Sequence, residues 1–160
     1  MLNLLPLLMA CGEQPTPPDL YINEFMADNQ STISNEDGEY SDWIELFNAG
    51  DEPISTGNLY LSDNLDNPTA HRMADLEIAP GGYLLIWADN ALDLGDYHVS
   101  FRLEKDGEAI GLSMLDDANE PILLDGVEFD AMAEDTSWGR LPDGGDWQTL
   151  DNPTPGSENR

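Results

Sequence analysis

Short apolar runs alternate with clusters of Gly, Pro, Asn and Asp along the chain, and the pattern repeats about every ten residues from Leu20 onward. No apolar stripe with a 3.6-residue period is long enough for an amphipathic helix. The pattern therefore predicts an all-β sandwich. We expect strands over residues 20–27, 42–48, 58–62, 71–76, 83–88, 98–103, 109–115, 122–129 and 137–140.

Strict alternation is clearest in two neighbouring runs. Val99, Phe101 and Leu103 alternate with polar residues, and the run 109–115 is apolar at every second position. Such alternation predicts that one side of each strand is buried and the other faces water. Asp106 and Gly107 lie between the runs and suit a tight turn with positive φ. We therefore expect the two runs to pair as an antiparallel hairpin.

The C-terminal region has a different composition. Beyond residue 140 the chain is rich in Pro, Gly, Asp and Asn, and residues 152–157 are typical of an extended closing segment with a loose end. We expect only Trp147 and Leu150 of this region to be held against the domain.

The net charge of the chain limits its possible partners more than its length does. The length of 160 residues predicts one domain, over residues 20–159, and the chain includes 33 Asp and Glu against five Lys and Arg, for a net charge of −28. Nucleic acids and anionic lipid surfaces bind clustered Lys and Arg, so they are excluded as partners. Such acidity keeps a protein soluble and monomeric and favours partners with cations, basic surfaces or Ca²⁺; the alternative is a merely solvated acidic surface.

The N-terminal residues suggest a location. Residues 1–10 are apolar and uncharged, and Cys11 follows them directly. This resembles a bacterial lipoprotein signal in which Cys11 is lipidated, although the basic n-region is missing; the alternative is an apolar tail with an unmodified thiol. Residues 11–19 then form a Pro-rich tether, and Gly12 favours the outer membrane. The expected location is the bacterial cell envelope, with membrane attachment only through the lipid on Cys11.

Several blocks in order resemble the bacterial lamin-tail domain, an immunoglobulin-like β-sandwich shared with nuclear lamins. The matching blocks are Ile22 to Ala27, Asp42 to Asn48, Pro80 to Tyr83, His98 to Leu103, Ser137 to Gly144 and Pro153 to Gly156. The resemblance covers about residues 20–159 and implies this fold, a secreted or cell-surface setting and sometimes a neighbouring hydrolase domain. It implies no catalytic residues.

The densest acidic loop, residues 35–42, is a candidate metal site. Ca²⁺ takes six to eight oxygen ligands, and Asp37, Glu39 and Asp42 surround a glycine that allows a loop to wrap around an ion. The spacing does not match an EF-hand. The alternative is a solvated loop whose Asp and Asn side chains make turns.

Other chemistry-bearing residues have structural explanations that we favour. Glu24 and Glu45 fall inside strands, where we expect them to bond loop amides or face solvent rather than act as an acid and base pair. His71 and His98, with Ser100 or Asp96, could in principle build a nucleophilic group. However, the sequence contains no Gly-x-Ser-x-Gly elbow, so we expect His98 to cap a strand instead.

Four tryptophans complete the candidates. Trp87 and Trp138 are expected in the core, whereas Trp43 and Trp147 are candidate partner-binding aromatics because aromatic faces stack on carbohydrate or peptide ligands. The sequence predicts a surface-anchored, non-catalytic binding or assembly module with a protein or cell-surface partner and no cofactor. The alternatives are a Ca²⁺-dependent adhesion module and an accessory domain to a secreted hydrolase.

Overall fold

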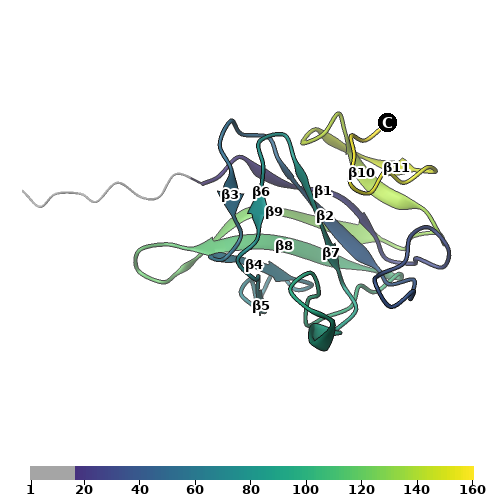
Figure 1. The fold of residues 1–160 in the computed structure, drawn as a ribbon, viewed down its shortest axis with the longest axis horizontal. Coiled ribbons are helices and arrows are strands. Elements are labelled where there is room, and N and C mark those ends of the chain that lie inside the picture. Colours follow the sequence, from purple (N-terminus) through teal and green to yellow (C-terminus); the bar gives the residue numbers. More distant parts are fainter. Residues whose placement is uncertain (1–16) are drawn as a thin grey trace, which may run out of the picture.

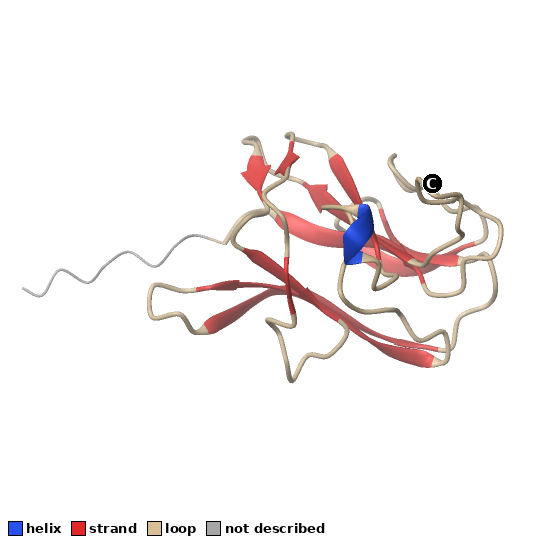
Figure 2. Cartoon of the chain, turned by 60° about the horizontal axis from the view of Figure 1, so that its bottom comes forward, coloured by secondary structure: helices blue, strands red, loops and turns tan. Residues whose placement is uncertain are grey.

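Two antiparallel sheets packed face to face make up the computed structural model, which describes residues 17–160 (Figures 1 and 2). The five-stranded sheet has the order β11-β10-β1-β2-β7, the four-stranded sheet has the order β5-β4-β8-β9, and β3 pairs with β6. The strands are β1 (Leu20–Met26), β2 (Trp43–Asn48), β3 (Ile54–Ser55), β4 (Leu59–Ser62), β5 (His71–Arg72), β6 (Glu77–Ile78), β7 (Tyr83–Trp87), β8 (Gly107–Leu115), β9 (Pro121–Asp130), β10 (Ser137–Leu141) and β11 (Asp146–Leu150). The predicted all-β sandwich is confirmed. The described residues contain one short 3₁₀ helix, Leu92–Leu94, and no helix among them is long and apolar enough to cross a membrane.

The core lies between the sheets and follows the alternation of each strand. In β2, Ile44 and Leu46 are fully buried in the main apolar cluster, whereas Trp43 belongs to a second, smaller cluster with Met26 and Trp87. The two clusters are on opposite faces of the five-stranded sheet because side chains of adjacent strand residues point to opposite faces. The outer face of this sheet is therefore also covered around Trp43.

A bulge in β1 breaks that alternation where polar residues are needed. The pairing of β1 with β2 shifts register between Ile22 and Glu24, so the extra residue, Asn23, has no direct partner. As a result Ile22 and Phe25 both reach the core, while Asn23 and Glu24, which are adjacent, hydrogen-bond to the C-terminal region.

The predicted hairpin of residues 98–103 and 109–115 is wrong. Residues 98–103 form no strand and make only isolated bridges, from His98 to Trp87 and from Arg102 to Asp89. The turn before Gly107 does form, but it leads into β8, which pairs with β4 and β9. The predicted burial pattern holds, since Val99, Phe101 and Leu103 are buried and the residues between them are exposed.

The C-terminal region is also more ordered than predicted. Strand β11 was not expected, and it extends the five-stranded sheet beyond β10. The segment after it is not loose, because Asn159 is only 3% exposed and bonds to several residues of the domain. The predicted strand over residues 71–76 is reduced to the two residues of β5.

Candidate functional site

A cleft of about 720 Å³ opens at the end of the sandwich where residues 27–30, 35–42, 88–94 and 102–105 meet, and we call it the loop-end cleft. Its lining is strongly charged. Five carboxylates line it, together with two cationic side chains: Asp28, Glu39, Asp42, Asp89, Glu104, Arg102 and Lys105. Lys105 Nζ lies 3.2 Å from Asp28 Oδ2, and the Arg102 guanidinium donates from Nε to the Asp89 carbonyl.

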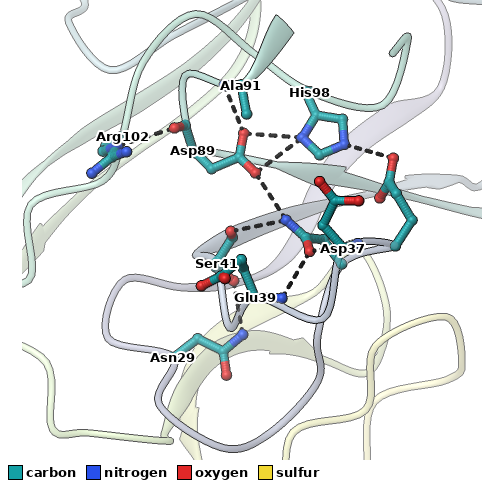
Figure 3. Close-up of polar contacts among 10 residues, drawn as sticks. Asn29, Asp37, Glu39, Ser41, Asp89, Ala91, His98 and Arg102 are labelled. Atoms are coloured by element: carbon teal, nitrogen blue, oxygen red, sulfur yellow. Dashed lines mark hydrogen bonds and ion pairs between the residues drawn. The ribbon is translucent and has the colours of Figure 1, made fainter. Parts of the chain in front are cut away.

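A buried histidine joins two segments beside this cleft (Figure 3). The His98 side chain is fully buried, with Nδ1 2.9 Å from Asp89 Oδ2 and Nε2 3.0 Å from Glu36 Oε1. Burial disfavours the charged ring, but the hydrogen bonds and charges of Asp89 and Glu36 outweigh burial and raise the pKa of His98. We expected His98 to cap a strand, and this is wrong. Its side chain instead connects the 35–41 loop to Asp89.

Amide side chains hold the rest of the loop. Asn35 Oδ1 accepts hydrogen bonds from the backbone N–H groups of Asp37 and Glu39, at 3.1 and 3.0 Å. Asn29 Nδ2 donates to the carbonyls of Ile33 and Ser41. The loop is thus held by Asn side chains acting on its own backbone, as expected for Asx turns.

The predicted metal-site residues occupy separate places in this loop. Asp37 and Glu39 are exposed, and Glu39 lines the cleft, whereas Asp42 is half-buried and accepts a hydrogen bond from the Asn29 N–H. Burial raises the pKa of Asp42 to about 6. Within residues 17–160, no three His, Cys, Asp or Glu side chains form a group that could hold a metal ion.

Glu24 and Glu45 have the structural role expected of them, bonding loop groups. Glu24 accepts hydrogen bonds from the Ser137 hydroxyl and from the N–H and hydroxyl of Thr154, and Glu45 accepts one from the Gly156 N–H at 2.5 Å. Both side chains are fully buried. Burial raises the pKa of Glu24 and raises the pKa of Glu45 to about 8.

The hydrogen bonds of Glu24 and Glu45 belong to a larger group of buried polar contacts that fixes residues 153–159, and we call this group the tail network. The rest of the tail network was not predicted from the sequence. Asn159 Nδ2 donates to the carbonyls of Asn23 and Arg140, and the Asn159 N–H donates to Asp143. Asp143 also accepts a hydrogen bond from the Tyr83 hydroxyl. The closeness of the packing is visible at Gly139, where an added Cβ would lie 2.8 Å from Asn159 Nδ2. The Asn-Glu pair in β1 and the Pro-Thr-Pro-Gly run are the two sequence motifs that meet in this network. A single sequence does not show that two motifs so far apart in the chain are in contact.

The two candidate tryptophans differ. Trp43 is fully buried, so its prediction as a partner-binding aromatic is wrong: it lies in the smaller apolar cluster, against which Ile33 packs. Trp147 is half-buried, packs edge-on against Phe25 and lies 4.4 Å from the Arg140 guanidinium. Its contacts are those of a residue that holds β11 to the domain.

Among the residues that the structure describes, 17–160, no nucleophilic group is assembled around the histidines. His71 Nδ1 lies 3.2 Å from the Ser100 hydroxyl, but the same nitrogen accepts the Ser100 N–H, and within residues 17–160 no carboxylate bonds to His71. His98 bonds Asp89 and Glu36 instead of joining this pair. A serine and a histidine without an orienting acid lack the geometry of a triad. Cys11, the predicted lipidation site, lies outside the described residues.

Comparison with known families identifies the fold. A family model described as Lamin Tail Domain matches residues 13–151, which is most of the chain. Neither the curated proteins nor the solved structures compared with the chain gave a match. The match agrees with the antiparallel sandwich and with a domain that is not catalytic.

Proposed function

Because the chain belongs to the lamin tail domain family, we propose that it acts as a non-catalytic interaction module at the bacterial cell envelope. A lipid on Cys11 anchors it, residues 12–19 hold the domain away from the membrane, and the loop-end cleft receives a protein or cell-surface partner. The lipoprotein-like sequence of residues 1–11 supports the anchor.

One observation carries the binding role: the loop-end cleft is open, acidic and already formed. Its five carboxylates come from four segments of the chain, and hydrogen bonds made by the side chains of Asn29 and Asn35 fix the loop that borders it. A surface that needs little ordering on binding loses less entropy and binds better. Its charge favours a partner with Lys or Arg side chains. Ca²⁺-dependent adhesion has no comparable observation in its support.

The binding role is tested by site-specific cross-linking in the producing cell. Tyr40 lines the cleft and is 51% exposed, while Leu123 on β9 is 52% exposed and lies outside the cleft. A photo-reactive amino acid at position 40 should give a discrete cross-linked product, and the same amino acid at position 123 should not. Identical products at both positions, or none at position 40, contradict the cleft as the binding surface.

The anchor is tested separately by fractionation. Cys11→Ala should move the protein from the membrane to the soluble fraction, and mass spectrometry of the parent should find a lipid on Cys11. Gly12→Ala leaves the cysteine in place and serves as the control. Retention of Cys11→Ala in the membrane fraction, with no lipid on the parent, refutes the anchor.

A further inference from the structure

Strand β7 leaves one side of its backbone open at Tyr83 and Leu85 but not at Trp87. It is the last strand of the five-stranded sheet, and it pairs only with β2 within residues 17–160. On its other side the Trp87 N–H donates to the Tyr97 carbonyl at 2.7 Å, and the Trp87 carbonyl accepts from Val99 at 2.9 Å. Backbone groups of a strand face alternate sides with a period of two residues, so Leu85 and Tyr83 present their N–H and C=O groups to this same open side.

The other edges of the two sheets are protected in the ways that natural sheets use. The exposed residues of β11 are polar, Asp146, Gln148 and Thr149, and β5 has only two residues. The β9 edge carries exposed acids at 128 and 130, although Leu123 of the same strand is also exposed. Short strands and charged edges discourage pairing with another chain. On β7 the outward side chains are instead Tyr83 and Leu85, which are half-buried, and Trp87, which is buried in the smaller apolar cluster.

A groove of about 590 Å³ runs beside this open edge. It is lined by the three outward side chains of β7, by Tyr97, which is 49% exposed, and by two carboxylates, Glu36 and Glu77. A groove that mixes apolar and acidic side chains next to unpaired backbone groups is an arrangement that accepts an added strand: the backbone supplies hydrogen bonds and the groove takes alternate side chains.

We infer that β7 binds an extended segment of a partner protein as an added strand, and that this segment carries Lys or Arg next to apolar side chains. Its apolar side chains occupy the groove over Leu85 and Trp87, and its basic side chains approach Glu36 and Glu77. The net charge of −28 on each chain opposes a second copy as the occupant and favours a basic one. The inference concerns a different surface from the loop-end cleft, so either proposal can fail while the other holds.

A peptide probe separates strand addition from simple attraction between charges. The probe is a fluorescent seven-residue peptide that alternates Lys and Val, capped at both ends, and its binding to the full chain is followed by anisotropy. Two matched peptides carry N-methyl groups on the backbone nitrogens of the valines only or of the lysines only. An added strand uses the N–H groups of one alternate set, so one methylated peptide should bind at least about tenfold more weakly and the other nearly as well as the parent. Equal binding of all three peptides overturns the inference.

Two variants locate the site on the protein. Leu85→Lys places a positive charge in the groove and should weaken binding of the unmethylated peptide at least about tenfold. Leu123→Lys adds the same charge on β9 and should leave the affinity within about twofold. Hydrogen exchange should show that the peptide protects the amides of Tyr83 and Leu85. Equal loss in both variants, protection confined to other strands, or a dimer of the full chain that Leu85→Lys dissociates would each overturn the inference.

Discussion

Two buried polar networks hold two different regions of this domain, and they do so with different chemistry. In the tail network, Glu24 and Glu45 are buried without a cation and accept hydrogen bonds from hydroxyl and backbone N–H groups of Ser137, Thr154 and Gly156. In the network beside the loop-end cleft, a histidine lies between two carboxylates, Asp89 and Glu36. One network relies on neutral donors and the other on a titratable cation.

The difference reflects how few basic residues the chain has. With five Lys and Arg for 33 Asp and Glu, most acids cannot form ion pairs, and only Asp28, Asp125 and Glu158 contact Lys or Arg within residues 17–160. A buried carboxylate must still be hydrogen-bonded, so neutral donors replace the missing cations. An acidic protein can therefore bury acids, but their pKa values rise when no cation compensates for desolvation.

Both networks should weaken as the pH rises, over different ranges. The pKa of Glu45 rises from an ordinary value of 4.5 to about 8, so its contribution to stability is complete below pH 4.5 and is lost as the pH rises towards 8. The pKa of His98 is raised above 6.5, so its contribution is complete below pH 6.5 and is lost above that. Variants can therefore separate the two networks.

Breaking the tail network at its centre should give the largest effect. Asn159→Ala removes hydrogen bonds from the buried carbonyl of Asn23 and from the carbonyl of Arg140, and it also removes one of the two acceptors of the Thr154 hydroxyl, the other being Glu24. Leaving such groups unsatisfied should lower the free energy of unfolding by about 2–4 kcal/mol in urea titrations. Glu158→Ala, at an exposed neighbouring position, should cost less than about 0.5 kcal/mol. Similar losses from both variants would mean that the tail is not held by this network.

The pH dependence of the tail network is tested at Glu45. The parent should lose stability from pH 5 to pH 8, with about 1–3 kcal/mol of the loss due to Glu45 alone. Glu45→Gln cannot ionise, so its free energy of unfolding should change less over the same range, whatever its stability at pH 5. Glu134→Gln removes an exposed acid and should keep the pH dependence of the parent. An unchanged slope in Glu45→Gln would remove Glu45 as the cause.

The role of the network beside the loop-end cleft is tested at His98. His98→Gln should cost about 1–2 kcal/mol at pH 6 and less at pH 9, where the parent ring is already neutral. The chain has two histidines, so both can be followed by NMR. His98 should titrate above pH 6.5 and His71 below it, because burial without a carboxylate partner lowers the pKa of His71. If His71 titrated at a higher pH than His98, the carboxylates beside His98 would not be what distinguishes its network from the tail network.

The sequence predicted the layers of this fold better than its pairings. Alternation correctly identified the buried side chains of Val99, Phe101 and Leu103, because burial depends on which face meets the core. It could not show that this segment lacks a strand partner, since pairing depends on distant segments such as β4 and β9. A paired strand and an extended segment without a strand partner show the same apolar period of two residues, so the period alone does not distinguish them.

The candidate sites show the same limit. Asp42 and Glu39 do line the loop-end cleft, as an acidic loop suggests, but His98 and Asp89 come from more than forty residues away. Trp43 was wrongly predicted as a partner-binding residue because a single apolar residue in a polar loop, Ile33, does not reveal in the sequence which cluster it packs against. Asn159 looked like part of a loose end because only the folded chain supplies its four partners.

The smallest effect is expected from the exposed partner of His98. The Glu36 side chain is 49% exposed and that of Asp89 is 9% exposed, although both lie within hydrogen-bond distance of the ring. Water can replace Glu36 but cannot reach the Nδ1 side as easily, so Glu36→Gln should leave the melting temperature within about 1 °C of the parent, whereas Asp89→Asn should lower it clearly. Both changes should lower the pKa of His98 in the NMR titration, because each removes a negative charge beside the ring. A fall in melting temperature from Glu36→Gln as large as that from Asp89→Asn would show that the loop depends on the exposed contact, and that burial does not rank the two carboxylates.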